Sequence, residues 1–309
     1  MPGPNPIHPH RVTPLDGMPA IRRDKLHFPL DERQLERHVR SALQEDGAFN
    51  DLTTIACVPS DTRRARATLC VWNAGVIAGV PFAIEAFRLL DAKVSIRCDA
   101  NDGDRVASGT AVMWISGHAR AMLSAERVAL NYLQHLSGIA TLTGRFVDAI
   151  RGTKARILDT RKTSPGLRLL EKYAVRAGGG TNHRVDLSDA VLIRDNHLLV
   201  TDGDIALAVR RARDLAPPDT RVEVECTTVE HVKIALAAGA DIVRLERMTP
   251  ALITECVGLA RGRALTEAAG SITLDNVRAI ADCGVDMISL GAITHSALAI
   301  PFALRFESA

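Results

Sequence analysis

The chain has 309 residues, of which 47% are hydrophobic, and its formal net charge at pH 7 is +2. This length and apolar content allow one large hydrophobic core and a second, smaller core, so we expect two domains. The nearly neutral balance argues against a protein that coats nucleic acid or an anionic membrane surface. No apolar run reaches the length of a transmembrane helix, and we therefore expect neither nucleic acid nor membrane as a partner.

The cysteines show neither a CxxC pair nor a histidine at zinc-finger spacing. They are scattered, at Cys57, Cys70, Cys98, Cys226, Cys256 and Cys283. We therefore expect reduced thiols and a cytoplasmic location. Residues 1–28 contain six prolines before Asp24 and lack the apolar stretch of a signal peptide, so we expect a disordered leader.

The N-terminal third predicts a small α+β domain over residues 29–137. Between residues 31 and 45, apolar side chains recur every four positions from Leu35 to Leu43, which indicates an amphipathic helix. A long helical pattern runs from about 119 to 136 and is expected to end near Gly138. Three segments rich in β-branched or aromatic residues predict strands at 65–73, 93–98 and 111–116.

From residue 138 to 295, short apolar strands alternate with amphipathic helices, which is typical of a β/α barrel. The predicted strands are 156–160, 190–194, 221–225, 241–246, 263–267 and 287–291. Helix starts are expected at Thr227, as a capping box with Glu230, and at Thr249 before Pro250. Gly239 and Gly284 are expected to end helices. We expect residues 296–309 to form a C-terminal helical segment that packs back on the N-terminal domain.

Charged residues stand where these strands are predicted to end, and β/α barrels place their active sites at that end. The series consists of Arg161, Lys162, Arg194, Asp195, Glu225, Glu246 and Glu267. Residues 151–194 contain ten Lys or Arg against four Asp or Glu, so the barrel mouth should be cationic and its substrate polyanionic. One glutamate at a strand end is more often an ion-pair partner than a catalytic group, but three at intervals of 21 residues favour a site.

Two motifs favour anion binding. Arg161 and Lys162 directly follow an apolar strand and precede a Pro-Gly turn, an arrangement that suits an anion better than ordinary surface charge. His183 stands in GGGTNHR (178–184), where glycines allow the backbone to approach a ligand. Backbone N–H groups after the last two predicted strands are candidates for a phosphate site, at Ala269, Gly270, Ser271, Leu290, Gly291 and Ala292.

The stretch LDTRKTSPGLRLLEKYAVRAGGGTNHR (158–184) closely resembles the signature segment of the quinolinate phosphoribosyltransferases. The resemblance continues through EDGAFNDLTT (45–54), SAERVALNYLQHLSGIAT (124–141), LSDAVLIRDNH (187–197), VEVE (222–225), TEAAGSIT (266–273) and GVDMISLGAITHS (284–296). It implies an incomplete β/α barrel with a smaller N-terminal α+β domain, and a homodimer, possibly part of a higher oligomer, whose active sites are shared. It also implies transfer of the phosphoribosyl group of phosphoribosyl pyrophosphate to quinolinate, with release of pyrophosphate and CO2 and formation of nicotinate mononucleotide.

The resemblance also assigns roles to residues. The quinolinate carboxylates would be bound by Thr160, Arg161, Lys162, His183, Arg184, Arg194 and, from the partner subunit, the residue equivalent to Arg127. Glu225 and Glu246 would face the ribose and its Mg²⁺ and act with Lys162 in catalysis. The residues Ala269, Gly270, Ser271, Leu290, Gly291 and Ala292 would bind the 5-phosphate.

Several positions depart from the family pattern. Arg194 replaces a lysine, Glu246 and Arg247 replace an Asp-Asn pair, Ala269 replaces a common serine, and Asp186 replaces a glycine. We expect Arg194, Glu246 and Arg247 to form an altered charge network whose members compensate one another. Three alternatives follow: a paralogue that acts on another pyridine or aromatic carboxylate, a lyase that uses Lys162 as a Schiff base, and a non-catalytic homologue.

Overall fold

The computed structural model describes residues 26–58 and 63–307, and it divides into two compact units. Among the described residues, unit 1 comprises 145–163 and 181–291, and unit 2 comprises 26–58, 63–144, 164–180 and 292–307. Most of the expected leader, residues 1–25, lies outside the described residues. In the described part of the chain, no helix is long and apolar enough to cross a membrane.

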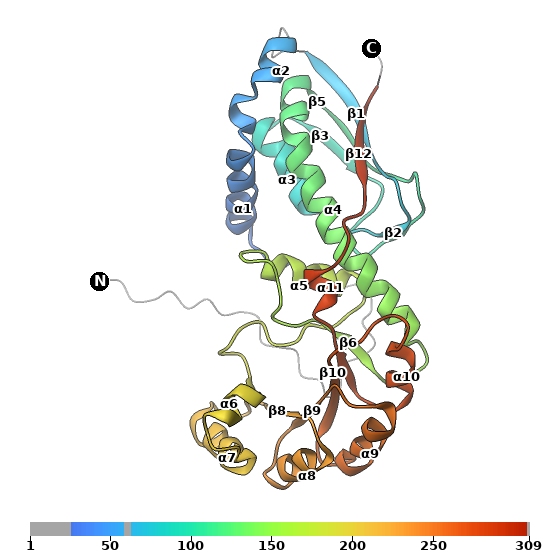
Figure 1. The fold of residues 1–309 in the computed structure, drawn as a ribbon. Coiled ribbons are helices and arrows are strands. Elements are labelled where there is room, and N and C mark those ends of the chain that lie inside the picture. Colours follow the sequence, from blue (N-terminus) through green and yellow to red (C-terminus); the bar gives the residue numbers. More distant parts are fainter. Residues whose placement is uncertain (1–25, 59–62, 308–309) are drawn as a thin grey trace, which may run out of the picture. The chain divides into compact units, whose positions relative to one another are not determined.

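Unit 2 contains the predicted α+β domain (Figure 1). Its strands β12, β1, β5 and β3 are paired in that order, and all the pairs are antiparallel. The elements in chain order are α1 (Glu32–Glu45), η2 (Ala48–Asn50), α2 (Leu52–Cys57), β1 (Arg64–Val71), β2 (Gly75–Val76), α3 (Val80–Leu90), β3 (Ser95–Cys98), β4 (Arg105–Val106), β5 (Ala111–His118), α4 (Ala119–Ala149), α5 (Arg168–Ala177), α11 (Ala292–His295) and β12 (Phe302–Phe306). The predicted first helix and three strands are therefore confirmed.

Two expectations for unit 2 were wrong. The C-terminal segment contains a strand, since residues 302–306 pair with β1 and place Phe302 opposite Val71. Helix α4 continues past Gly138 to Ala149, and its residues 145–149 belong to unit 1. A Cβ atom at Gly138 would lie 2.3 Å from the carbonyl oxygen of Leu298, so this glycine allows a close approach of two backbones inside a helix that continues.

Segment 164–180 belongs to unit 2, although we expected it within the barrel. Its helix α5 places the Tyr173 hydroxyl 2.6 Å from Asp102. The following glycines pack closely on α4, because a Cβ atom at Gly178 would lie 2.3 Å from the Ala140 carbonyl oxygen. These contacts explain why the unit boundaries differ from the predicted domain boundary at residue 138.

Unit 1 contains six parallel strands in the order β6, β11, β10, β9, β8, β7. Its elements are β6 (Arg156–Leu158), β7 (Val191–Ile193), α6 (Asp195–Leu199), α7 (Ile205–Leu215), β8 (Val222–Cys226), α8 (Val229–Ala237), β9 (Ile242–Glu246), α9 (Pro250–Ala260), β10 (Leu265–Ala269), α10 (Val277–Asp282) and β11 (Met287–Ser289). All six predicted strands are present. The two end strands of this order, β6 and β7, do not pair with each other among the described residues, so the barrel is incomplete.

The helix ends of unit 1 follow the sequence signals with one exception. Thr249 caps α9 ahead of Pro250, and Gly239 and Gly284 both adopt a φ of +84° just after helix ends. The cap of α8 is Thr228 instead of Thr227, because the Thr228 hydroxyl accepts the hydrogen bond from the backbone N–H of His231. Apolar strand residues Leu158, Ile242 and Met287 form a buried cluster, and Leu265 packs against it.

Asp286 joins three segments of unit 1 and should contribute to stability in a pH-dependent way. Its carboxylate accepts hydrogen bonds from the Thr266 backbone at 2.9 Å, the Thr266 hydroxyl at 2.8 Å and Lys154 at 2.7 Å. Burial raises the pKa of Asp286, but the hydrogen bonds from Lys154 and Thr266 outweigh it and lower the pKa below its usual 3.8. Since the folded pKa is depressed, the stabilisation is present above pH 4 and is lost as the pH falls through the folded pKa.

We expect Asp286→Asn to lower the free energy of unfolding by about 1–2 kcal/mol at pH 7 and by less at pH 3.5. Urea unfolding at both pH values measures the difference. The control is Asp282→Asn, which removes an exposed partner of Arg278 and should cost less than about 0.5 kcal/mol. An Asp286→Asn effect of equal size at the two pH values would contradict the assignment.

Candidate active site

Asp159 fixes the loop that carries two predicted site residues. It follows β6, is fully buried, and accepts hydrogen bonds from the Asn182 side chain at 2.6 Å and the His183 backbone at 2.8 Å. The Thr181 N–H donates to the carbonyl of Ile157 at 2.8 Å, so the loop runs beside β6. Because a buried carboxylate accepts both hydrogen bonds, the backbone that carries the His183 and Arg184 side chains is held in place.

His183 lies between two buried glutamates. Its Nε2 is 3.1 Å from Glu223 of β8 and 3.4 Å from Glu267 of β10. Its Nδ1 accepts a hydrogen bond from the Arg184 N–H at 2.7 Å, which places the proton of the neutral ring on Nε2, facing the carboxylates. Burial lowers the pKa of His183, but the charges of Glu267 and Glu223 outweigh this and raise the pKa to about 10. The hydrogen bond that Nδ1 accepts from the Arg184 N–H acts against this rise, because a second proton on the ring would have to displace it.

The two glutamates around His183 differ in their own pKa values. Burial and the nearby charge of Glu267 raise the pKa of Glu223. Burial also opposes ionisation of Glu267, but the charges of His183 and Arg244 lower its pKa to about 2. The three ligand atoms lie within 4.8 Å of one another, a spacing that a metal ion accepts. Because these groups already pair with one another and with Arg244, we assign them as a buried ion-pair cluster.

The structure corrects the placement of Glu267. We expected it at the end of a strand 263–267, but β10 spans Leu265–Ala269 and places Glu267 in the middle, fully buried. The shift arises because the N–H groups of Arg263 and Ala264 both donate to the carbonyl of Ala260, so these residues still belong to the turn after α9.

Arg244 in β9 was not among the predicted site residues. Strand register places it level with Glu225 of β8 and with Glu267 of β10. Its Nε lies 3.4 Å from Glu246 and its Nη1 lies 3.4 Å from Glu267. The sequence did contain a signal for it, because Arg244 is a charged residue between the apolar residues of the strand IVRLE (242–246).

The predicted cations also come together in unit 1. Arg184 is buried, and its Nη1 donates to the carbonyl of Ala190 at 2.7 Å. Burial lowers the pKa of Arg184, and the charges of Arg161, Arg194 and Arg244 lower it further. The charge of Glu223 acts in the opposite direction, so Arg184 lies near both cations and a carboxylate, and the cationic barrel mouth stays a prediction.

Three other predicted residues are placed as follows. Lys162 is exposed, and its backbone N–H donates to the Thr160 hydroxyl at 3.1 Å. Arg127 belongs to unit 2, where it is exposed on α4.

The structure shows one ion pair of the expected network of Arg194, Glu246 and Arg247, and the compensation between its members stays a prediction. Arg247 lies 3.8 Å from Glu246, but in the described part of the chain the other ion pair of Glu246 is with Arg244, and none joins it to Arg194. Burial and the charge of Glu246 raise the pKa of Glu225, and the charges of Arg244 and Arg194 oppose this rise.

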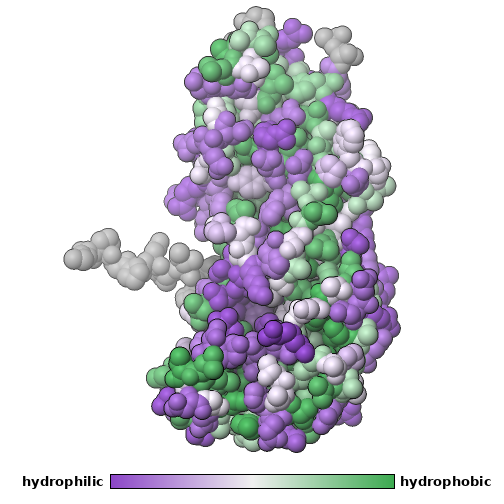
Figure 2. Space-filling model, viewed as in Figure 1, coloured by the Kyte–Doolittle hydropathy of each residue, from purple (hydrophilic) through white to green (hydrophobic). Residues whose placement is uncertain are grey.

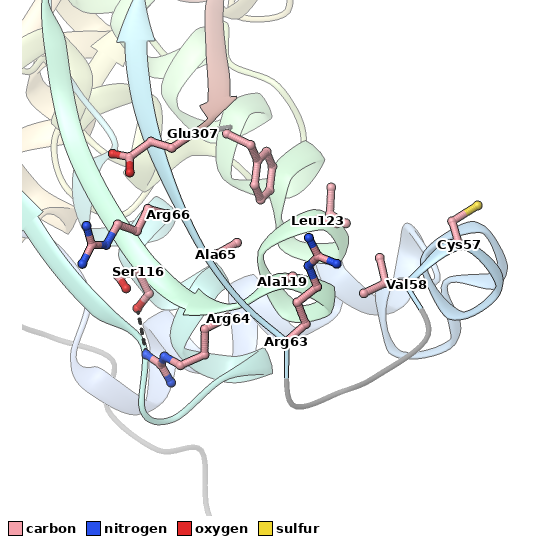
Figure 3. Close-up of a pocket in the computed structure, with 11 residues that line it drawn as sticks. Cys57, Val58, Arg63, Arg64, Ala65, Arg66, Ser116, Ala119, Leu123 and Glu307 are labelled. Atoms are coloured by element: carbon pink, nitrogen blue, oxygen red, sulfur yellow. Dashed lines mark hydrogen bonds between the residues drawn. The ribbon is translucent and has the colours of Figure 1, made fainter. Parts of the chain in front are cut away.

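Two cavities bear on the position of the site. One of about 470 Å³ in unit 1 is lined in part by Arg184, Arg194 and His197. The other, of about 670 Å³, lies in unit 2 beside Arg63, Arg66 and Leu123 (Figure 3). No predicted site residue lines the second cavity in the described structure.

Comparison with known proteins identifies the family. The family model for the quinolinate phosphoribosyl transferase C-terminal domain matches residues 139–305, and that for the N-terminal domain matches residues 51–137. This chain belongs to the quinolinate phosphoribosyltransferase family. The "Probable nicotinate-nucleotide pyrophosphorylase [carboxylating]" of Bacillus subtilis is 40% identical over 86% of this chain and 91% of its own. The Mycobacterium leprae nicotinate-nucleotide pyrophosphorylase [carboxylating] is 41% identical over 84% of this chain and 92% of its own.

Solved structures of family members share the fold. The nicotinate-nucleotide pyrophosphorylase of Francisella tularensis superposes with a TM-score of 0.84 at 38% identity, over 91% of this chain and 99% of that one. NadC from Streptococcus pyogenes gives a TM-score of 0.85 at 39% identity, over 90% and 99% of the two chains. The combination of an incomplete β/α barrel and a smaller N-terminal α+β domain is thus the architecture of the quinolinate phosphoribosyltransferases.

In this quinolinate phosphoribosyltransferase, the two predicted phosphate loops differ in structure. Gly270 and Ser271 follow β10 but do not begin a helix, because α10 starts only at Val277. Ala292, by contrast, is the first residue of α11, as expected. The N–H of Leu290 donates to the carbonyl of Leu158 and is therefore already used within the sheet.

Gly270 is required by the backbone. Its φ is +119°, and a Cβ atom there would lie 2.7 Å from Cγ and 3.1 Å from the backbone nitrogen of Arg247. We expect Gly270→Ala to lower the free energy of unfolding by about 2–3 kcal/mol. The control is Gly262→Ala, at a φ of +72° with no atom within 4 Å of the added Cβ, which should cost about 1 kcal/mol. Equal losses for the two variants in urea unfolding would contradict the collision with Arg247.

Proposed function

We propose that the protein transfers the phosphoribosyl group of phosphoribosyl pyrophosphate to quinolinate and decarboxylates the adduct, giving nicotinate mononucleotide, pyrophosphate and CO2. This is the phosphoribosyltransferase step of NAD biosynthesis. The supporting observation is that unit 1 brings a cluster of guanidinium groups beside the carboxylates Glu225 and Glu246. The names of relatives about 40% identical over most of the chain support the same reaction.

Quinolinate has two carboxylates, and the cationic side of the site suits it. Guanidinium groups bind carboxylates in pairs of parallel hydrogen bonds. Burial of Arg184 and its crowding by other cations disfavour its charge until an anion binds, so a dianionic acceptor relieves the repulsion. We assign acceptor binding to Thr160, Arg161, Lys162, His183, Arg184, Arg194 and the partner subunit's Arg127.

Glu225 and Glu246 suit the phosphoribosyl side. Burial and the charge of Glu246 raise the pKa of Glu225, so these carboxylates lie near enough to repel and would gain from a divalent cation. Their oxygens fit Mg²⁺, which would neutralise the charge of the pyrophosphate leaving group. As pyrophosphate departs, positive charge develops on the ribose carbon. The two carboxylates stabilise it while Lys162 stabilises the leaving group.

No protein nucleophile is needed in this scheme. The pyridine nitrogen attacks the ribose carbon and becomes positively charged. The adjacent carboxylate then leaves as CO2, and its electron pair stays on the ring carbon beside that positive nitrogen. Fixed cations such as Arg161 and Arg184 stabilise the negative charge that develops at this carbon before it is protonated.

The 5-phosphate is assigned to the loops after β10 and β11. Gly270 lets the chain turn tightly against Arg247, which brings backbone close to the barrel mouth. Ala269 and Ser271 flank it, and Leu290, Gly291 and Ala292 form the second loop. This is the position where β/α barrels commonly bind phosphate.

We further propose a cytoplasmic homodimer with shared sites, possibly part of a higher oligomer. All six cysteines are free, as in a reducing compartment. Exposed hydrophobic residues gather over α6 and α7, where Figure 2 shows a hydrophobic area, and Leu199, Val200 and Leu215 are each more than three-quarters exposed. Apolar surface of this kind is typically covered in an oligomer.

One experiment tests the reaction. The protein is incubated with phosphoribosyl pyrophosphate, MgCl2 and each of a panel of pyridine and related aromatic carboxylates, and the products are identified by mass spectrometry. We expect nicotinate mononucleotide from quinolinate, with equimolar pyrophosphate, and loss of both when EDTA is added. Absence of both products at millimolar substrate would overturn the proposal.

The panel also tests the second candidate function, a paralogue with another acceptor. The observation that favours it is the altered acidic pair, since Glu246 is flanked by Arg244 and Arg247. Better turnover of a different carboxylate would select it. A Schiff-base lyase is less suited to the structure, because lysines used in that way are typically desolvated, whereas Lys162 is exposed among cations.

A further inference from the structure

Arg244 occupies the centre of an acidic group inside the barrel. Its side chain is 14% exposed, compared with 15% for Glu246 and 1% for Glu267. Glu225, Arg244 and Glu267 lie level on three neighbouring strands, so a guanidinium stands between two carboxylates in one row. Glu246, two residues further along β9, lies on the same side of the strand.

The guanidinium of Arg244 uses both of its edges. Nε faces Glu246 and Nη1 faces Glu267, each at 3.4 Å. Burial lowers the pKa of Arg244, but the charges of Glu267, Glu223, Glu246 and Glu225 outweigh this effect and raise the pKa above its usual value. Because both edges are directed at protein carboxylates, Arg244 is oriented to hold these groups in place, and it is poorly placed to grip a substrate directly.

The two contacts of Arg244 reach opposite sides of the proposed site. Glu246 belongs to the phosphoribosyl side. Glu267 also pairs with His183, which belongs to the acceptor side, at 3.4 Å. Arg244 therefore contacts the phosphoribosyl side directly, and its ion pairs reach His183 of the acceptor side through one intervening group, Glu267.

We propose that Arg244 is a positioning residue that orients Glu246 for the phosphoribosyl substrate. This inference rests on the proposed function. The alternative partner of Glu246 is Arg247, whose side chain is 68% exposed and lies 3.8 Å away. Without Arg244, Glu246 loses its buried partner and turns towards Arg247. The acceptor side keeps the His183 pair with Glu223 and Glu267.

The test compares Arg244→Met with Arg244→Lys in the full-length protein at fixed free magnesium. We expect Arg244→Met to raise KM for phosphoribosyl pyrophosphate by about 10- to 100-fold, while KM for quinolinate changes less than about threefold. Arg244→Lys keeps the charge but loses the two-edged geometry, and should recover part of the effect. Parallel changes in both KM values would overturn the proposal, because a general loss of structure acts on both substrates.

A double variant separates positioning from charge balance. Arg244→Met leaves buried carboxylates without a cation and risks unfolding, whereas Arg244→Met with Glu267→Gln removes one charge of each sign. We expect the double variant to regain thermal stability and still show the raised KM for phosphoribosyl pyrophosphate. A return of this KM to the wild-type value would show that only charge balance matters, and would overturn the proposal.

Two further measurements complete the design. The control Arg213→Met removes an exposed partner of Asp241 and should leave both KM values unchanged. Calorimetric titration with phosphoribosyl pyrophosphate and MgCl2 measures binding without turnover, and we expect the same 10- to 100-fold weakening for Arg244→Met. If wild-type protein binds this ligand but forms no product, the proposed reaction fails while the role of Arg244 is still decided. Equal affinities of wild type and Arg244→Met would overturn that role.

Discussion

Replacement of Lys162 by alanine is expected to lower kcat for nicotinate mononucleotide formation by about 100- to 1000-fold. The lysine stands in the cationic mouth and is assigned to the charge of the departing pyrophosphate, which is larger in the transition state than in the bound substrate. An interaction that strengthens in this way acts on kcat more than on KM. Single-turnover and steady-state assays measure the two parameters.

The exposure of Lys162 makes this substitution easy to interpret. Because the side chain is exposed, the thermal unfolding temperature should stay within about 2 °C of the wild type. The matched control is Lys233→Ala, an exposed lysine of α8 whose partner is Glu230. Full activity of Lys162→Ala, or an equal loss for Lys233→Ala, would exclude Lys162 from catalysis.

Mixing two inactive variants should restore about a quarter of the wild-type activity. If Arg127 acts in the site of the partner subunit, a hybrid of Arg127→Ala and Lys162→Ala contains one intact site and one with both defects. Random exchange makes about half of the dimers hybrid, and half of their sites are intact. Arg127 is exposed on α4, so its removal should leave the subunit folded.

Subunit exchange must be shown independently, by native mass spectrometry of the mixture. Each variant incubated alone serves as the control and should remain inactive. A mixture that contains hybrid dimers and shows no activity would mean that Arg127 and Lys162 serve the same subunit's site. This result would contradict active sites shared between subunits, but it would not contradict the proposed homodimer.

The sequence predicted the strands of the barrel better than their exact ends. All six were found because short apolar runs alternate with well-signalled helices, and this pattern is local. The end of a strand depends on how far the preceding turn extends. Arg263 and Ala264 remain bonded to Ala260, so Glu267 moves from the expected mouth to the buried interior. A shift of two residues thus changed its expected environment completely.

Candidate site residues could be named where chemistry follows from residue type and position, but not where it depends on pairing between strands. Arg161, Arg184 and Arg194 were expected because they stand in cationic motifs. Arg244 was missed because its role comes from lying level with Glu267, a relation that only strand register creates. Gly138 was misinterpreted for a similar reason, since the approach of Leu298 is a contact between distant parts of the chain.

The pairing of β1 with β12 also bears on how the protein folds during synthesis. Ala67 lies opposite Phe306, so one sheet joins an early and a late part of the chain, and every strand of unit 1 is made between them. Domains fold as they emerge from the ribosome, and unpaired strand edges expose a nascent chain to aggregation. One edge of β1 must therefore wait for its partner until the barrel strands have been synthesised, so we expect unit 1 to complete its sheet before unit 2.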